Sequence, residues 1–158
     1  MNAILISSIW GVLILIISLW QKNRKAIFLI SLIGLIILWI ANYYQFNGSN
    51  LINWSSDFIQ TSNASLFYML LIIGFSILYF MLNKSAFEEI PKFTNEIYVL
   101  LFFTLTGSCI LAFFDNLLML FLGLEILSLP LYILTGIDER NVLGIEASLK
   151  YFLMGAFF

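Results

Sequence analysis

Residues 117–135 read LLMLFLGLEILSLPLYILT, an uninterrupted apolar run that contains a single ionisable carboxyl group, that of Glu125. A helix rises about 1.5 Å per residue, so a run of this length crosses the hydrocarbon core of a bilayer, which is roughly 30 Å thick. The stretch therefore predicts a transmembrane helix that carries a carboxyl group near its middle.

Four further runs have the same character: Ala3–Trp20, Ala26–Ala41, Leu66–Leu82 and Ile97–Phe114. A sixth run begins around Ala147 and reaches the last residue after roughly half a bilayer thickness. We expect it to be the start of a sixth span in a truncated chain; the alternative is a re-entrant or interfacial helix. The pattern predicts an all-α polytopic transmembrane helix bundle with five full spans and the start of a sixth.

The composition excludes a water-soluble globular protein. The 158 residues are 62% hydrophobic and 10% charged, whereas a soluble domain is roughly 45–50% apolar and about 25% charged. The chain has no histidine and one cysteine, Cys109. His-based catalysis, haem ligation, zinc sites of the usual kind and cysteine-ligated iron–sulfur clusters are therefore excluded. The formal net charge of −2 gives no basic surface for nucleic acid.

The loop cations predict the orientation of the chain. They alternate along the sequence: Lys22, Arg24 and Lys25 follow the first run, Lys84 and Lys92 the third, and Arg140 the fifth. The segment 42–65 and the turn at residues 115–116 contain no Lys or Arg. Because cytoplasmic loops retain positive charge, we expect the N-terminus outside and the three cationic loops in the cytoplasm or its equivalent.

Glu125 is the main candidate for function, because an ionised side chain at the centre of a span costs about 2.5–3.5 kcal/mol. Helical spacing places Ser128 and Tyr132 on the same stripe as Glu125, so this stripe should face protein or water. Pro130 cannot donate to the carbonyl of Ile126, which either kinks the helix or leaves that oxygen free for another donor. Glu125 is either a protonatable relay group or part of a structural ion pair.

Lys150 is a second candidate, and its position admits three interpretations. It follows Glu146 by four residues, the favourable order for a helical ion pair. It could also extend its ammonium group to the membrane interface. The apolar residues that follow it place it at the edge of the hydrocarbon, where it could pair with Glu125 from an adjacent helix.

Other polar and aromatic residues have simpler interpretations. The small and hydroxylated residues of the fourth run are expected to permit close helix packing; they are Thr104, Thr106, Gly107, Ser108 and Cys109. Asp115 is expected to cap the next helix. Three aromatic residues of the second loop predict an interfacial belt; they are Tyr43, Tyr44 and Trp54.

Two stretches resemble a known family. DNLLMLFLGLEILSLPLYILTG (115–136), followed by IEASLKYFLMGA (145–156), is similar to the fifth and sixth helices of the antiporter-like proton-translocating subunits of respiratory complex I. Within this family, the combination ExxSLPLY and EASLKYFLMGA resembles the subunit N branch, the homologue of mitochondrial subunit 2, more than subunits L or M. The first three runs match only in number and orientation.

The resemblance implies a fold and a role. Family members contain inverted helix repeats around a midplane ion path, which would make residues 1–96 an N-terminal three-helix segment and residues 97–158 the start of the first repeat. Glu125 and Lys150 would be members of a proton relay, whose partner lysine in the family lies beyond Phe158. The form of the N-terminus resembles bacterial or plastid members, which favours the bacterial inner membrane over plastid or mitochondrial membranes.

The leading hypothesis is therefore a membrane subunit of an NADH:quinone oxidoreductase that contributes to proton translocation. No cofactor is expected on this chain, and other membrane subunits of the complex would be its partners and would handle NADH and quinone. Two alternatives remain: a subunit of a multisubunit cation/proton antiporter, and a purely structural membrane subunit.

Overall fold

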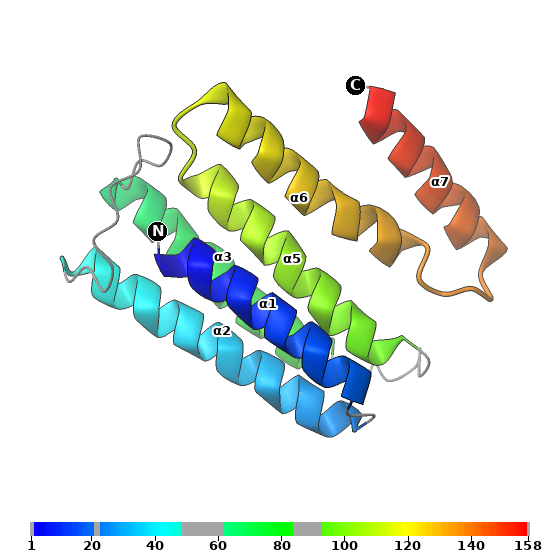
Figure 1. Ribbon diagram of the computed structural model, residues 1–158, viewed down its shortest axis with the longest axis horizontal. Helices are drawn as coiled ribbons and strands as arrows, with labels where there is room; N and C mark the ends of the chain where they lie inside the picture. The colour runs from blue at the N-terminus through cyan, green and yellow to red at the C-terminus, as the bar shows by residue number, and fades with distance from the viewer. Residues whose placement is uncertain (1, 21–22, 49–61, 84–92, 158) are drawn as a thin grey trace.

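The computed structural model describes residues 2–20, 23–48, 62–83 and 93–157. Within these ranges the chain forms six α-helices, drawn in Figure 1: α1 (Asn2–Trp20), α2 (Arg24–Phe46), α3 (Asn63–Leu82), α5 (Thr94–Ala112), α6 (Leu117–Thr135) and α7 (Val142–Phe157). In the described part of the chain, five helices, all but α7, are long and apolar enough to cross a membrane. The predicted all-α membrane bundle is confirmed.

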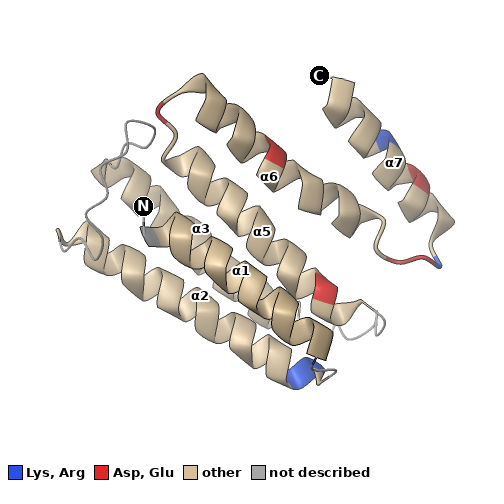
Figure 2. Cartoon of the chain, in the orientation of Figure 1, with Lys and Arg blue, Asp and Glu red and all other residues tan. Residues whose placement is uncertain are grey.

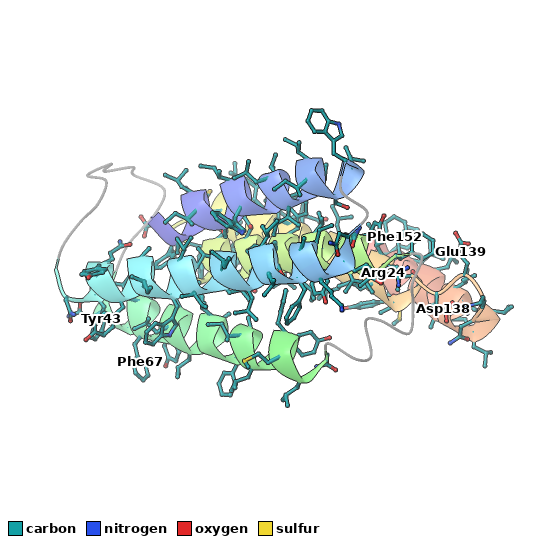
Figure 3. All side chains as sticks on the ribbon, turned by 90° about the horizontal axis from the view of Figure 1, so that it is seen from below. Arg24, Tyr43, Phe67, Asp138, Glu139 and Phe152 are labelled. Carbon is teal, nitrogen blue, oxygen red and sulfur yellow. The ribbon has the colours of Figure 1, made fainter. Side chains whose placement is uncertain are left out.

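Successive helices run antiparallel (Figure 1). α1 packs against α2 and α5, α2 against α3, α5 against α6, and α6 against α7. In Figure 3, Tyr43 and Phe67 lie at one end of the bundle, and Arg24, Asp138 and Glu139 lie at the opposite end. We call this second end the cation end, because Arg24, the first residue of α2, and Arg140, in the turn between α6 and α7, both lie at this end. Lys22, Lys84, Lys92 and Trp54 lie outside the described residues.

The predicted boundaries hold for α6 and differ elsewhere. α2 continues to Phe46, so Tyr43 and Tyr44 belong to a helix and not to a loop. The helix extends this far because Asn42 is fully buried and its Nδ2 donates to the carbonyl of Leu66 on α3 at 3.0 Å. α7 begins at Val142, five residues before the predicted start near Ala147, because the side chain of Asn141 accepts a hydrogen bond from the Gly144 backbone N–H at 3.1 Å.

The cap of α6 also differs from the prediction. Asn116 occupies the N-cap, and its Oδ1 accepts a hydrogen bond from the backbone N–H of Met119 at 2.9 Å. Asp115 lies one residue too early in the chain and is exposed. The expectation that Asp115 caps the helix is therefore wrong; the neighbouring amide performs the same task without a charge.

The apolar core lies between α1, α2, α3 and α5. An aromatic cluster occupies its centre: the ring of Phe80 lies 5.5 Å from that of Tyr98 and 6.2 Å from that of Phe102, between ring centroids. Phe28 on α2 adds a further contact with Tyr98 at 5.9 Å. These rings join α2, α3 and α5 into one packed unit.

Two glycines permit close helix approach. Gly34 on α2 receives the indole of Trp10, whose Nε1 donates to the carbonyl of Ile30 at 3.1 Å. A Cβ at Gly107 would lie 2.5 Å from the backbone N of Leu127, so α5 and α6 pack backbone to backbone there. The predicted packing role is confirmed for Gly107, and Thr106 and Cys109 are buried, whereas Thr104 and Ser108 line a groove between α3 and α5.

α6 and α7 bury far less than the other helices. Only Gly123 and Pro130 of α6 are buried, and no described residue of α7 is. Figure 1 shows α7 beside α6 at the edge of the bundle, and α6 is the one described helix that α7 contacts.

Candidate functional site

Glu125 lies in the middle of α6, where its side chain is partly buried. Figure 2 shows the acidic position of α6 with no basic position of the adjacent helix beside it. Among the described residues, no cation lies within ion-pair distance of its carboxylate. In the described part of the chain, Glu125 therefore has no cation with which it could form the structural ion pair.

The orientation of α6 explains this placement. Gly123 contacts Leu111, and Leu127 contacts Gly107, so these two residues mark the side of α6 that faces α5. Each residue turns a helix by about 100°, so Glu125 and Tyr132 lie on the opposite side. That side faces α7: the ring of Tyr132 packs edge to face on that of Tyr151, with centroids 4.7 Å apart. The predicted polar stripe does face protein at Tyr132.

Ser128 and Pro130 have local roles in α6. The Oγ of Ser128 donates to the backbone carbonyl of Glu125 at 3.3 Å. Pro130 is buried on the side of α6 that faces α5, and the helix continues through it without a break to Thr135.

Lys150 does not approach Glu125. Its Nζ pairs with Glu146 Oε1 at 2.5 Å, which confirms the predicted i, i+4 pair, and both side chains are more than half exposed. Helical spacing places Lys150 on the side of α7 opposite Ser148 and Gly155, the residues that contact α6. The lateral pair between Glu125 and Lys150, one of the three interpretations of Lys150, does not form between these two described residues, because α7 turns its charged face away from α6.

The contact between α6 and α7 was not foreseen in its details. Ser148 Oγ donates to the backbone carbonyl of Tyr132 at 2.6 Å. Gly136 leaves room for Ser148, and Gly155 leaves room for the hydroxyl of Tyr132, which a Cβ at that position would overlap. Glycines facing a tyrosine and a serine at helical spacing are the signal that could have identified this contact.

The turn between α6 and α7 contains an ion pair between Asp138 and Arg140. Asp138 Oδ1 accepts from the backbone N–H of Arg140 at 3.2 Å and from its Nε at 3.1 Å. The backbone hydrogen bond, and secondarily the guanidinium, lower the pKa of Asp138 below its ordinary value.

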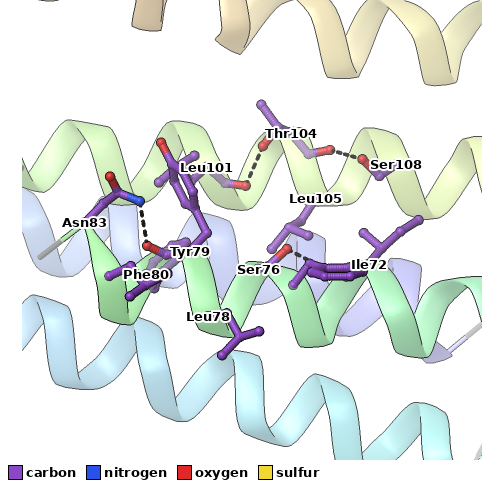
Figure 4. A pocket seen from close by; sticks show the side chains of 12 residues that line it. Ile72, Ser76, Leu78, Tyr79, Phe80, Asn83, Leu101, Thr104, Leu105 and Ser108 are labelled. Carbon is purple, nitrogen blue, oxygen red and sulfur yellow. Dashed lines mark hydrogen bonds between the residues drawn. The ribbon is translucent and has the colours of Figure 1, made fainter.

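A separate groove of about 630 Å³ lies between α3 and α5 (Figure 4). Its wall is apolar apart from a few polar side chains, and three of its hydroxyl groups donate to carbonyls of their own helices: Ser76 to Ile72, Thr104 to Leu101 and Ser108 to Thr104. No charged residue lines it. Among the described residues, the groove therefore has no carboxylate or ammonium group comparable to that of Glu125 or Lys150.

Residues 115–157, which comprise α6 and α7, match a family model described as "NADH:quinone oxidoreductase/Mrp antiporter, TM". The matched region contains Glu125 and Lys150. The helices that form the apolar core, α1, α2, α3 and α5, lie outside it, and α5 is in contact with α6.

The whole chain is similar to longer proteins. It is 34% identical to NADH-quinone oxidoreductase subunit N of Cytophaga hutchinsonii over 99% of this chain and 34% of the relative. It is 33% identical to the protein of the same name from Flavobacterium johnsoniae over 85% of this chain and 28% of the relative. It is 34% identical to NAD(P)H-quinone oxidoreductase subunit 2, chloroplastic, of Mesostigma viride over 98% of this chain and 31% of the relative. The chain thus spans about a third of the length of these relatives.

Proposed function

This chain belongs, by similarity over almost its whole length, to the subunit N family of NADH-quinone oxidoreductases, and from that premise we propose that it contributes to proton translocation coupled to quinone reduction. The proton-carrying part is the α6–α7 region. α1, α2, α3 and α5 form the support against which α6 packs.

The observation that carries the proposal is the state of Glu125. A carboxylate at membrane depth must be either neutral or compensated by a cation or hydrogen-bond donors. Glu125 has no cation beside it in the described residues and is partly buried in an apolar span. A cation that approaches or withdraws would therefore change its protonation, and this coupling is what a translocating subunit needs.

Lys150 is proposed as a second titratable member of the relay. Its ion pair with Glu146 lies on the side of α7 that faces away from α6. In this arrangement the ion pair of Lys150 and the carboxylate of Glu125 lie on different faces of the α6–α7 pair.

The remaining assignments follow from the family. The chain offers no histidine and only the buried Cys109 as a thiol, so we propose that it binds neither redox cofactor nor metal. Other subunits would bind NADH and quinone, and other membrane subunits would be its direct partners. The bacterial relatives support placement in the bacterial inner membrane.

The test is the variant Glu125→Gln in the full-length protein within its complex, with Glu96→Gln as the matched control. Glu96 is an exposed acid in the first turn of α5, at the cation end. We expect Glu125→Gln to assemble but to slow proton uptake into membrane vesicles at least several-fold, because glutamine keeps the size but does not titrate. Wild-type proton uptake by assembled Glu125→Gln would refute the proposal.

A second candidate function is a cation/proton antiporter subunit, because the description of the matching family model also names Mrp antiporters. The two functions separate in a transport assay. Proton movement driven by a sodium gradient, without NADH or quinone, supports the antiporter; proton movement that requires NADH and quinone supports the oxidoreductase subunit.

We also propose that the cation end faces the cytoplasm, on the strength of the positive charge in its loops. Cys109 is buried, so new surface cysteines can be labelled in its presence. Glu139→Cys should react with an impermeant maleimide only after permeabilisation, and Gly48→Cys should react in intact cells. The reverse pattern would invert the orientation.

A further inference from the structure

Polar groups gather along the contact between α6 and α7. Four hydroxyl-bearing residues, which we call the hydroxyl line, lie between the cation end and Glu125: Thr135, Ser148, Tyr132 and Ser128. Both helices are otherwise mainly apolar. The line begins at the last residue of α6, beside the turn that contains Arg140, and reaches the backbone of Glu125.

Three of these hydroxyls donate to backbone carbonyls. Ser148 and Thr135 both donate to the carbonyl of Tyr132, at 2.6 and 2.8 Å, and Ser128 donates to the carbonyl of Glu125 at 3.3 Å. A hydroxyl that donates still has lone pairs that can accept a hydrogen bond from water. The side chains are therefore held in place and still offer acceptors.

The hydroxyl of Tyr132 differs from the other three. It makes no hydrogen bond with the described residues, and its side chain is only partly buried. It lies against Gly155, where any side chain would displace it, and Tyr151 and Phe152 hold its ring from the edge, at centroid distances of 4.7 and 5.8 Å. A tyrosine hydroxyl at apolar depth needs a partner, and the ring that carries it cannot turn away.

Glu125 lies about two helical turns before Tyr132 on the same side of α6. The two residues are separated by about 10 Å along α6, at 1.5 Å per residue. Side chains on a helix lean toward its N-terminus, so the long side chain of Tyr132 leans from the cation end toward Glu125. No hydrogen bond joins the two side chains in the described residues, so a link between them would pass through water beside Ser128.

We propose that Tyr132 is a positioning residue for proton access to Glu125: its hydroxyl holds the water that links the cation end of the bundle to the carboxylate. This inference rests on the proposed relay role of Glu125. In each transfer the held water accepts a proton from the side of the cation end and releases one to Glu125, whose carboxylate becomes a carboxylic acid. The Tyr132 hydroxyl keeps its own proton and only holds the water in place.

The test is Tyr132→Phe in the full-length complex, with Tyr151→Phe as the matched control. Both changes delete one hydroxyl and keep the ring, so the stacking between the two helices persists. We expect Tyr132→Phe to slow proton uptake several-fold per assembled complex and Tyr151→Phe to leave it unchanged. A wild-type rate in Tyr132→Phe would overturn the inference and is what a purely packing role predicts.

Two further variants cover the remaining outcomes. If Tyr132→Phe fails to assemble, Gly155→Ala displaces the hydroxyl by steric overlap; slowed uptake supports the inference and an unchanged rate overturns it. In the double variant Tyr132→Phe/Glu125→Gln, the second change should add little to the first, because residues on one path are non-additive. Fully multiplied losses would overturn it. Normal uptake in Glu125→Gln alone would instead refute the proposed function.

Discussion

The two halves of this chain share an apolar composition but use it differently. α1, α2, α3 and α5 direct their apolar side chains into a common core with an aromatic centre. α6 and α7 bury only Gly123 and Pro130 between them. The polar groups follow the same division: Ser7, Ser31 and Asn42 are sealed within the first group, whereas the carboxylate of Glu125 and the ammonium of Lys150 remain accessible on the second.

This difference indicates that equally hydrophobic helices can form both a buried scaffold, here α1, α2, α3 and α5, and a less buried pair, here α6 and α7. In a bilayer, apolar burial adds little to helix association, and close packing and hydrogen bonds take over. The first group uses close packing, as between Gly34 and Trp10, and hydrogen bonds between helices, as from Asn42 to the Leu66 carbonyl. In the second group, α6 packs closely on α5 at Gly107 and Gly123, whereas α7 contacts α6 alone among the described helices.

The largest stability effect is expected in the first group, at Gly34. The variant Gly34→Leu forces a side chain into the indole of Trp10 and breaks the bond from that indole to the carbonyl of Ile30. Overpacking of this kind costs about 1–3 kcal/mol, so the yield and the Tm of the solubilised full-length protein should fall. The matched control is Gly74→Leu on α3, where a Cβ meets open space. Equal losses in both variants would contradict the packing assigned to α1 and α2.

A smaller effect is expected from the buried amide of Asn42. The variant Asn42→Ala removes its bond to the carbonyl of Leu66 and leaves a small cavity, at a cost of about 1–2 kcal/mol. Gln45→Ala is the control, because Gln45 is also buried on α2 and its Oε1, like the Oδ1 of Asn42, has no hydrogen-bond partner among the described residues, so the tested difference is the bond from Asn42 Nδ2 to the Leu66 carbonyl. Thermal unfolding of the full-length protein should rank Asn42→Ala below Gln45→Ala; the opposite order would contradict the assigned hydrogen bond.

The second group should tolerate loss of its ion pair. Lys150 and Glu146 are both more than half exposed, and exposed pairs contribute about 0–1 kcal/mol. Lys150→Gln should therefore leave the Tm within about a degree or two of wild type, since 1 kcal/mol shifts the Tm of a protein this large by only a few degrees. A fall as large as that of Gly34→Leu would show that α7 is part of the scaffold.

The smallest effect is expected at the turn between α6 and α7. The pKa of Asp138 is lowered in the folded protein by the backbone N–H and the guanidinium of Arg140. A lowered folded pKa gives a stabilisation that is present above the unfolded pKa and is lost as the pH falls through the folded one. The protection of the Arg140 amide against hydrogen exchange should stay constant from pH 7 to 5. It should fall only below the ordinary aspartate pKa of about 4. Loosening between pH 7 and 5 would contradict this account.

The sequence supported the fold better than the site. The run 117–135 predicted α6 to the residue, because long apolar runs in a membrane leave the backbone no choice but a helix. The end of α2 escaped prediction because Asn42 looks like a loop residue until its partner, the Leu66 carbonyl, is known. Tyr132 and Ser128 were placed on one stripe with Glu125 from spacing alone. The direction of Lys150 was not predictable, because it depends on how α7 rotates when Gly136 and Gly155 admit Ser148 and Tyr132.

The central claim is that Glu125 changes its protonation state during turnover, and infrared difference spectroscopy on the intact complex tests it most directly. Addition of NADH and quinone to wild-type complex should produce a protonated-carboxyl C=O band that shifts in D2O and is missing from Glu125→Gln. Glu96→Gln should keep the band. An identical difference spectrum in wild-type and Glu125→Gln complexes would show that Glu125 keeps one protonation state throughout, and would contradict the account.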